Sequence, residues 1–189
     1  MTRSQLEHVL RAAAAISECS TIMVVGSQAI LGEHPDAPPE LLVSMEVDIY
    51  PLERPERADL IDGAIGEVSA FHETFGYYAQ GVGPETATLP RGWERRLVRI
   101  VASPAVGLCP ETHDLVLSKY AAGREKDRDY VRAAARHALV RQDVLLARLE
   151  DLPITEEHRI RLRGLIGQDF APGHGLEQFQ TEPGPDRER

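Results

Sequence analysis

Lysine is nearly missing from this chain. Of its 21 basic residues only Lys119 and Lys126 are lysines, and all the others are arginines. A preference for arginine codons explains the scarcity, but it does not explain why both lysines fall in one short window. Lysine is a compact, strongly hydrated point charge, whereas arginine presents a rigid planar fork, so a site that needs lysine tolerates arginine poorly. The two lysines therefore mark a candidate site, with chance clustering of two residues as the alternative.

Cysteine and long apolar runs are also scarce, and each absence excludes a class of protein. Cys19 and Cys109 are the only cysteines and do not show the spacing of metal ligands, so reduced thiols in the cytoplasm are expected. No apolar run approaches the length of a membrane-spanning helix. The N-terminus lacks the basic and then apolar pattern of a signal peptide. These features predict a soluble, cytoplasmic protein without a membrane partner.

The balance of charge excludes a further class of partner. The formal net charge is −9, which argues against indiscriminate binding of duplex DNA. The segment 119–141 departs from this balance, since it holds seven basic side chains against three acidic ones. A local basic stripe on an acidic protein favours a phosphate-bearing ligand over a long duplex.

The hydrophobic pattern predicts an α+β fold. Helices are indicated by apolar residues at helical spacing, and strands by short β-branched or alternating runs. The expected strands are 21–25, 42–50 and 97–101, with short strands and turns in 76–95. The expected helices are 4–17, a short one from Gly26 and Ser27 to Leu31, 57–71 with Leu60, Ile61, Ile65 and Val68 facing inward, 111–122, 125–138, 141–150, and 155–168 with Thr155 as N-cap.

These elements group into a small mixed sheet with flanking helices in residues 1–108, followed by a helical C-terminal half in residues 109–170. The chain of 189 residues is long enough for a substantial core. The segment 171–189 is rich in Pro, Gly and charged residues and has little to bury, which indicates a disordered tail.

Gly26 and Ser27 follow the apolar run 21–25 and open the short helix. Because glycine has no Cβ, a phosphate can approach the backbone there, and the helix that follows offers unpaired N–H groups. Ser27 can donate its hydroxyl to the same phosphate. An ordinary strand-to-helix turn capped by Ser27 is the alternative, because a bare Gly-Ser pair is a weak motif.

Two carboxylates, Glu46 and Asp48, stand two residues apart on the strand 42–50. Successive strand side chains alternate between faces, so both acids share one face. The residues expected on the opposite, buried face are Val43, Met45, Val47 and Ile49, which places the strand inside the sheet. Grouped carboxylates repel each other unless a cation compensates, and Mg²⁺ prefers oxygen ligands of this kind. A solvated edge-strand face is the alternative.

A third group of polar residues combines Asp114, Lys119 and the run 124–129. Lys119 stands among apolar residues of the helix 111–122, from which it can reach a triphosphate. The run supplies two further phosphate contacts, Arg124 and Lys126, and two candidate metal ligands or bases, Asp127 and Asp129. A charged, solvent-facing helix with local ion pairs is the alternative. Tyr77, Tyr78 and Trp93 are expected to pack in the core rather than to stack on bases.

Together these residues resemble the DNA polymerase β-like nucleotidyltransferase superfamily, in which a strand, a Gly-Ser turn and a helix precede a strand with an acid-x-acid motif. Gly26-Ser27 and Glu46-Val-Asp48 carry this resemblance. Asp114-x4-Lys119 and the run 124–129 are similar to the third and fourth motifs of the abortive-infection AbiEii-type branch. The segments 76–82 and 89–96 are similar to a bacterial family of unknown function that is assigned to the same superfamily. The resemblance covers residues 20–132.

The resemblance implies a transfer of a nucleoside monophosphate from an NTP to an acceptor hydroxyl, with Mg²⁺ or Mn²⁺ as cofactor. It implies that Glu46 and Asp48 ligate the metal ion. The residues implied to contact phosphates are Gly26, Ser27, Lys119, Arg124 and Lys126. The residues implied to act in catalysis are Asp48, Lys119, Asp127 and Asp129.

AbiEii-type proteins are toxins that transfer nucleotides, in some cases to tRNA, in toxin-antitoxin or phage-defence systems. The resemblance thus implies RNA, tRNA or a protein as acceptor, and a cognate toxin or antitoxin as partner. Three departures stand against it: Glu46 occupies a position where Asp is usual, the loop before it is long and contains proline, and the strand 97–101 carries no carboxylate. A catalytically reduced nucleotide-binding module, regulatory or antitoxin-like, is therefore the alternative, and a structural interaction protein is the third.

Overall fold

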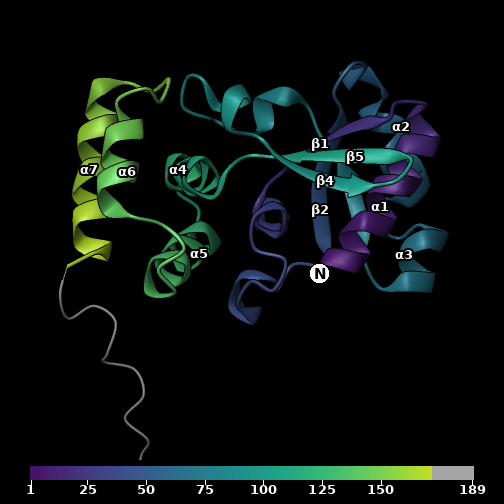
Figure 1. The fold of residues 1–189 in the computed structure, drawn as a ribbon, viewed down its shortest axis with the longest axis horizontal. Coiled ribbons are helices and arrows are strands. Elements are labelled where there is room, and N and C mark those ends of the chain that lie inside the picture. Colours follow the sequence, from purple (N-terminus) through teal and green to yellow (C-terminus); the bar gives the residue numbers. More distant parts are fainter. Residues whose placement is uncertain (172–189) are drawn as a thin grey trace, which may run out of the picture.

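A five-stranded mixed sheet lies at the centre of the structure, a computed structural model that describes residues 1–171 (Figure 1). The strands are β1 (Thr21–Val25), β2 (Glu46–Pro51), β3 (Tyr78–Gly81), β4 (Val98–Ala102) and β5 (Ala105–Cys109). Their order in the sheet is β3-β2-β1-β5-β4. The pairs β1/β5 and β2/β3 are parallel, whereas β1/β2 and β4/β5 are antiparallel. The predicted α+β class with a mixed sheet is confirmed, and β2 lies inside the sheet as expected.

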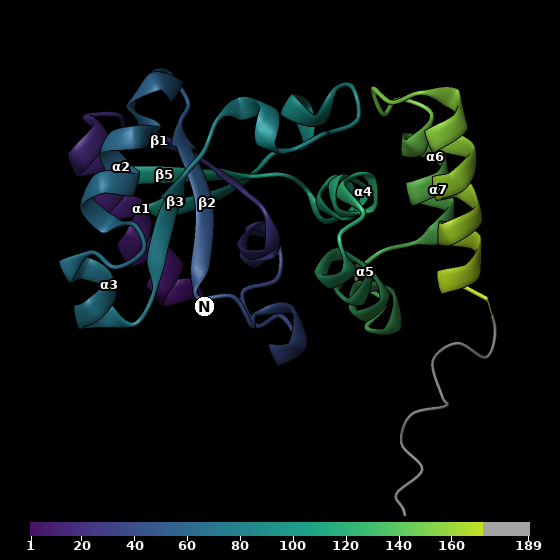
Figure 2. The ribbon, with the colours of Figure 1, turned by 180° about the vertical axis from the view of Figure 1, so that it is seen from behind.

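Seven α-helices and several short 3₁₀ helices surround and extend this sheet within residues 1–171. The α-helices are α1 (Arg3–Ser17), α2 (Ala58–Ile65), α3 (Ala70–Phe75), α4 (Thr112–Ala122), α5 (Glu125–Arg136), α6 (Gln142–Leu149) and α7 (Glu156–Asp169). Figures 1 and 2 show α4 and α5 between the sheet and the pair α6 and α7, so the helical C-terminal half extends from one end of the sheet. Thr155 caps α7 as predicted, because its hydroxyl accepts the N–H of His158.

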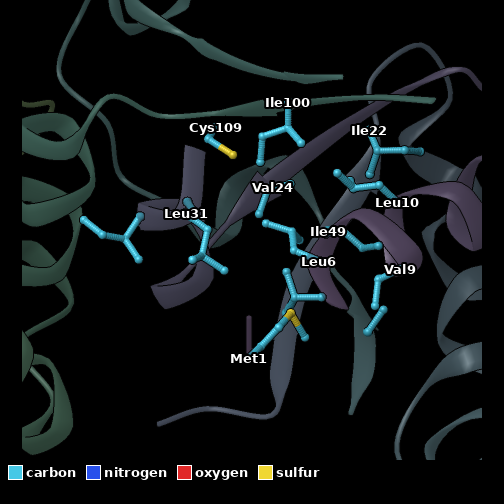
Figure 3. Close-up of a cluster of buried hydrophobic side chains, with 14 of the residues drawn as sticks. Met1, Leu6, Val9, Leu10, Ile22, Val24, Leu31, Ile49, Ile100 and Cys109 are labelled. Carbon is cyan, nitrogen blue, oxygen red and sulfur yellow. The ribbon is translucent and has the colours of Figure 1, made fainter. Parts of the chain in front are cut away.

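One face of the sheet packs against α1, as Figure 3 shows for the buried residues between them. The apolar stripe of α1, which includes Leu6 and Leu10, contacts the side chains that β1 and β2 direct to this face. Val47 and Ile49 of β2 belong to this cluster and are almost wholly buried. Since strand side chains alternate, Glu46 and Asp48 face the other side of the sheet.

The other face carries a smaller apolar cluster. Met23, Val25 and Tyr50 are buried there, and Trp93 packs against them from the segment that links β3 to β4. A third cluster, built from α4 to α7, is the core of the helical half and includes Leu117, Tyr120 and Leu162. Helix α4 joins the two parts of the molecule, because its Leu115 belongs to the core under α1.

An ion-pair network fastens α6 to the beginning of α4. The carboxylate of Asp114, which is fully buried, accepts hydrogen bonds from Arg96 Nε at 2.7 Å and from Arg148 Nη1 at 2.8 Å. Glu111 contacts the same Arg148 and also His113. Burial alone would raise the pKa of Glu111, but the hydrogen bonds and charges of His113 and Arg148 outweigh burial and lower this pKa to about 2.

The predicted helix 57–71 is wrong as one continuous element. A 3₁₀ turn precedes α2, and the chain breaks between Ile65 and Ala70 before α3 begins. Gly66 takes an extended conformation and Val68 a positive φ of 64°, which a helix does not accommodate. Val68, in this break, is exposed rather than inward-facing, and so is Leu60, which lies on the outer side of α2; Ile61 and Ile65 are buried as expected.

Two further expectations about the sheet need correction. The strand predicted over 42–50 begins only at Glu46, and Val43 and Met45 are exposed instead of joining the buried face. Strand β5, which lies between β1 and β4, was not expected from the sequence at all. The predicted tail lies outside the described residues from position 172 onward.

Two simpler observations complete the fold. Both cysteines are free and buried. Within residues 1–171, no helix is both long and apolar enough to cross a membrane.

Candidate functional site

The carboxylate of Glu46 is held in place by the neighbouring strand. Glu46 is paired with Tyr78 in the parallel register of β2 and β3, and the Tyr78 hydroxyl donates to Glu46 Oε2 at 2.9 Å. Burial and the hydrogen bond to Glu46 raise the pKa of Tyr78 to about 12. The phenol therefore remains a donor near neutral pH and fixes one oxygen of Glu46.

Asp48 lies on the same face of β2 and is half-buried. Its burial, together with the negative charge and hydrogen bonding of Glu46, raises the pKa of Asp48 to about 6, and the positive charges of Lys119 and Arg124 offset this only in part. Burial and the neighbouring carboxylate of Glu46 thus both disfavour the ionised form of Asp48. Binding a cation between the two carboxylates would relieve their repulsion.

Gly26 ends β1 directly beside Asp48, because Val25 is paired with Asp48 across the antiparallel strands. Its backbone has φ 69° and ψ −165°, a region that is essentially restricted to glycine. A Cβ at this position would lie 2.2 Å from Asp48 Oδ2. The backbone geometry and the close approach of Asp48 therefore both require glycine here.

Ser27 begins a 3₁₀ helix (Ser27–Gly32) and does not cap it with its side chain. The alternative in which Ser27 serves as an ordinary cap is therefore wrong. Its hydroxyl instead accepts a hydrogen bond from Lys119 Nζ at 2.9 Å, and its carbonyl accepts one from the Tyr130 hydroxyl at 2.9 Å. The Gly-Ser turn is thus fastened to both α4 and α5.

Lys119 reaches this turn from the last part of α4 and is only 6% exposed. Its Nζ also lies 3.0 Å from Asp127 Oδ1 and 5.2 Å from the centre of the Tyr130 ring. Burial lowers the pKa of Lys119, and the charge of Asp127 partly offsets that effect. An ammonium group has three N–H donors, and Ser27 and Asp127 engage two of them.

Asp127 is 1% exposed and is held between two cations. Besides Lys119 it accepts a hydrogen bond from Arg124 Nε at 2.6 Å. Burial would raise the pKa of Asp127, but Arg124 and Lys119 outweigh burial and lower it. A carboxylate with a lowered pKa is a weak base, so this geometry suits Asp127 to orienting Lys119 and Arg124 better than to accepting a proton.

A cavity of about 210 Å³ opens where these elements meet. Gly26 and Asp48 line it from the sheet, and Lys119 and Arg124 line it from α4 and the turn that follows. The remaining lining residues are Thr86, Ala87, Leu115, Ser118 and Ala122. Asp48 of the acid-x-acid motif and Arg124 of the basic run 124–129 therefore line the same cavity.

Of the predicted polar residues that do not line this cavity, Ser27 and Asp127 bond to Lys119 and Glu46 lies beside Asp48, whereas three others lie away from it. Lys126 and Asp129 are exposed on α5, and Asp114 is engaged in the network with Arg96 and Arg148. The periodicity of α5 explains this difference, because Asp127 shares the buried face with Tyr130 and Val131, whereas the positions on either side of Asp127 point away. A role of Lys126 or Asp129 in phosphate binding or catalysis stays a prediction without support from the geometry.

Sequence reasoning missed two tyrosines of the site. Tyr78 was expected to pack, but its hydroxyl orients Glu46, and Tyr130 supports both Ser27 and Lys119. Tyr78 lies beside Glu46 only through the register of β2 and β3, so the sequence alone gives no signal for its role. The packing roles expected of Tyr77 and Trp93 are confirmed.

A mixed sheet with two acids on an inner strand, a Gly-Ser turn beside them and a buried lysine from α4 is consistent with a nucleotidyltransferase type of architecture. The chain belongs to the family described as nucleotidyltransferase of unknown function (DUF6036), whose model matches residues 4–163. No curated protein and no solved structure matches the chain. The family confirms the nucleotidyltransferase assignment, and its description names neither a substrate nor an acceptor.

Proposed function

We propose that this chain is a nucleotidyltransferase that uses Mg²⁺ or Mn²⁺ to transfer a nucleoside monophosphate from an NTP to an acceptor hydroxyl. The observation that carries the proposal is the cavity in which Gly26, Asp48, Lys119 and Arg124 meet. These residues come from three separate segments of the chain, and an accidental charged surface would not bring them together. The family supports the same class of reaction.

The residues around Asp48 fit a hard divalent cation. Glu46 and Asp48 supply carboxylate oxygens, and burial and then the charge of Glu46 raise the pKa of Asp48, so that a bound cation would favour its ionised form. Within residues 1–171 no group of three or more His, Cys, Asp or Glu side chains is placed to hold a metal ion. Mg²⁺ is typically bound by one or two carboxylates together with water and substrate phosphates. A site with two carboxylates therefore fits an ion that arrives with the triphosphate.

The opposite wall of the cavity fits the phosphates. Lys119 has one N–H beyond those engaged by Ser27 and Asp127, and Arg124 presents a guanidinium that suits phosphate oxygens. Gly26 also lines the cavity, and its lack of a side chain allows the Asp48 carboxylate to lie against the turn. Lys119, Arg124 and Gly26 would thus orient the triphosphate with its α-phosphorus near the carboxylates.

The proposed reaction balances without any further reactant. An acceptor hydroxyl attacks the α-phosphorus, a new P–O bond forms, and the bond to the bridging oxygen of the leaving group breaks. Pyrophosphate departs with its negative charge compensated by Lys119 and Arg124, and the hydroxyl proton passes to water. Bound Mg²⁺ or Mn²⁺ would supply neutralisation of the phosphate oxygens and activation of the acceptor hydroxyl.

The acceptor that we propose is an RNA such as tRNA, or a protein, within a toxin-antitoxin or phage-defence system. The support is the resemblance of the motifs around Lys119 to the AbiEii-type branch, and a cognate toxin or antitoxin would be the physiological partner. The acidic net charge of −9 fits an acceptor recognised locally rather than bulk duplex DNA.

One observation favours a second candidate function. The strand next to the two acids, β3, places Tyr78 and Gln80 opposite Glu46 and Asp48, so no third carboxylate stands on that strand. A site with a reduced set of acids would suit a nucleotide-binding regulatory or antitoxin-like module that binds NTP without transferring it.

An assay of label transfer from α-labelled NTP distinguishes the nucleotidyltransferase from the nucleotide-binding regulatory module. Wild-type protein is incubated with α-labelled NTPs, Mg²⁺ and either total RNA or total protein, in parallel with Asp48→Asn. Asp59→Asn is the matched control, because Asp59 is an exposed carboxylate on α2, outside the cavity. We expect label transfer by wild type and by the control, dependent on Mg²⁺ and lost in Asp48→Asn.

Two outcomes would overturn parts of the proposal. Transfer that survives in Asp48→Asn would show that Asp48 does not serve the reaction. Calorimetry that detects Mg²⁺-dependent NTP binding, together with no transfer to any acceptor, would favour the regulatory module.

A further inference from the structure

A second cavity, of about 330 Å³, lies between α4, α5 and α7. It shares Lys119 and Ala122 with the proposed nucleotide cavity, but its other walls belong to the helical half. Arg128, Arg161 and His158 line it together with apolar side chains. The motifs of the nucleotidyltransferase site do not account for it.

Two arginine side chains in the wall of this cavity are available to bind a ligand. Both lining carboxylates are already engaged: Asp127 by Lys119 and Arg124, as described above, and Asp169 by the Tyr120 hydroxyl at 3.0 Å and by Arg132 Nε at 3.2 Å. Across residues 1–171, by contrast, the guanidinium groups of Arg128 and Arg161 form neither an ion pair nor a hydrogen bond to a protein group. The cavity therefore favours an anion.

The apolar part of the wall indicates the rest of the ligand. Val131 and Leu162 are buried core residues, and Leu165 is half-buried beside them. The volume of the cavity lies within the range of small-molecule sites, which are typically apolar with a few polar groups that fix orientation. Arginine guanidinium groups match phosphate oxygens in a bidentate manner. A phosphate joined to a flat, partly apolar base fits both parts of the wall.

We propose that this second cavity binds a phosphorylated nucleoside, either a free mononucleotide or the phosphorylated end of an RNA strand. The phosphate lies between Arg128 and Arg161, and the base lies on Leu162 and Leu165. Since Lys119 lines both cavities, ligand in the second cavity touches the residue that we assign to the triphosphate. Binding here needs neither the metal ion nor transfer, so it stands apart from the proposed reaction.

The test is a calorimetric titration with AMP, and in parallel with a short 5′-phosphorylated oligoribonucleotide, in buffer that contains EDTA. Chelation suppresses metal-dependent binding in the first cavity and leaves the second cavity to be measured. The variants are Arg161→Gln and Arg128→Gln, both exposed positions whose substitution leaves the core intact. Arg163→Gln is the matched control, because Arg163 lies on the same helix, is paired with Glu150 and stays outside the cavity.

We expect wild type and Arg163→Gln to bind AMP equally, and each of the other two variants to bind about tenfold more weakly, as for the loss of one charged hydrogen bond. Tighter binding of the oligonucleotide than of AMP would identify an RNA end as the ligand, and the reverse a free nucleotide. The proposal is overturned if wild type binds neither probe. It is also overturned if Arg124→Gln abolishes binding while Arg161→Gln and Arg128→Gln leave it unchanged, because the ligand would then occupy the first cavity.

Discussion

Replacing Gly26 by alanine tests whether the close contact between the β1 turn and Asp48 builds the site. The new Cβ would lie 2.2 Å from Asp48 Oδ2, well inside contact distance, so the carboxylate must move. The backbone at φ 69° and ψ −165° adds about 1–3 kcal/mol of strain for a residue other than glycine. A domain of this size loses about 2–4 °C in Tm per kcal/mol. We expect a lower Tm together with a loss of Mg²⁺-dependent NTP binding.

Gly76→Ala is the control for a substitution at a glycine of positive φ that creates no contact, with ψ 12° in place of the −165° of Gly26. Gly76 has a similar φ of 74°, and a Cβ there would meet nothing within 4 Å. We expect this variant to lose about 1 kcal/mol of stability and to bind NTP like wild type. The assays are thermal unfolding and calorimetric titration with NTP in the presence of Mg²⁺. If Gly26→Ala bound NTP as tightly as Gly76→Ala, the contact with Asp48 would have no part in the site.

Three further substitutions test the surroundings of the cavity. Tyr78→Phe removes the hydroxyl that orients Glu46, and we expect NTP binding to need about tenfold more Mg²⁺; an unchanged Mg²⁺ titration would contradict that role. Asp127→Asn leaves the buried Lys119 without its carboxylate, so denaturant unfolding should show a loss of about 3–5 kcal/mol, and a loss below 1 kcal/mol would argue against a buried pair. For Glu111 the pKa of about 2 lies below the ordinary 4.5, so its ion pairs stabilise the fold above pH 5, by up to about 3 kcal/mol, and this stability is lost as the pH falls towards 2. Urea unfolding of Glu111→Gln at several pH values should lack that dependence, and a slope equal to that of wild type would refute it.

The elements in which apolar residues recur at a regular helical or strand spacing could be predicted from the sequence. Helix α1 and the helices of the C-terminal half repeat apolar residues at helical spacing, and they lie close to the expected ranges. Alternation along β2 placed Glu46 and Asp48 on one face, and the structure confirms it. Strand β5 could not be predicted, because Ala105–Cys109 is a short segment in which apolar and polar residues do not clearly alternate. Its pairing with β1 and β4, rather than local propensity, makes it a strand.

The candidate site was predictable only in part, because tertiary contacts decide which polar residues meet. The scarcity of lysine singles out Lys119 and Lys126 equally. In the structure, however, Lys119 lies on the buried side of α4 and Lys126 on the exposed side of α5. Asp127 was one of two acids of the run 124–129 proposed for catalysis, and only its place on the Tyr130 face of α5 identifies it as the partner of Lys119. The pairing of Tyr78 with Glu46 depends on the register of β3, which no local pattern reveals.

The central claim is that the cavity closed by Lys119 holds the triphosphate. Because the chain has only two lysines, calorimetric titration of Lys119→Gln and Lys126→Gln with each of the four NTPs in Mg²⁺ tests it most directly. Loss of a charged contact to phosphate in Lys119→Gln should weaken binding about tenfold or more, whereas Lys126→Gln should stay close to wild type. Equal binding by Lys119→Gln and wild type, or a larger loss in Lys126→Gln, would contradict the claim.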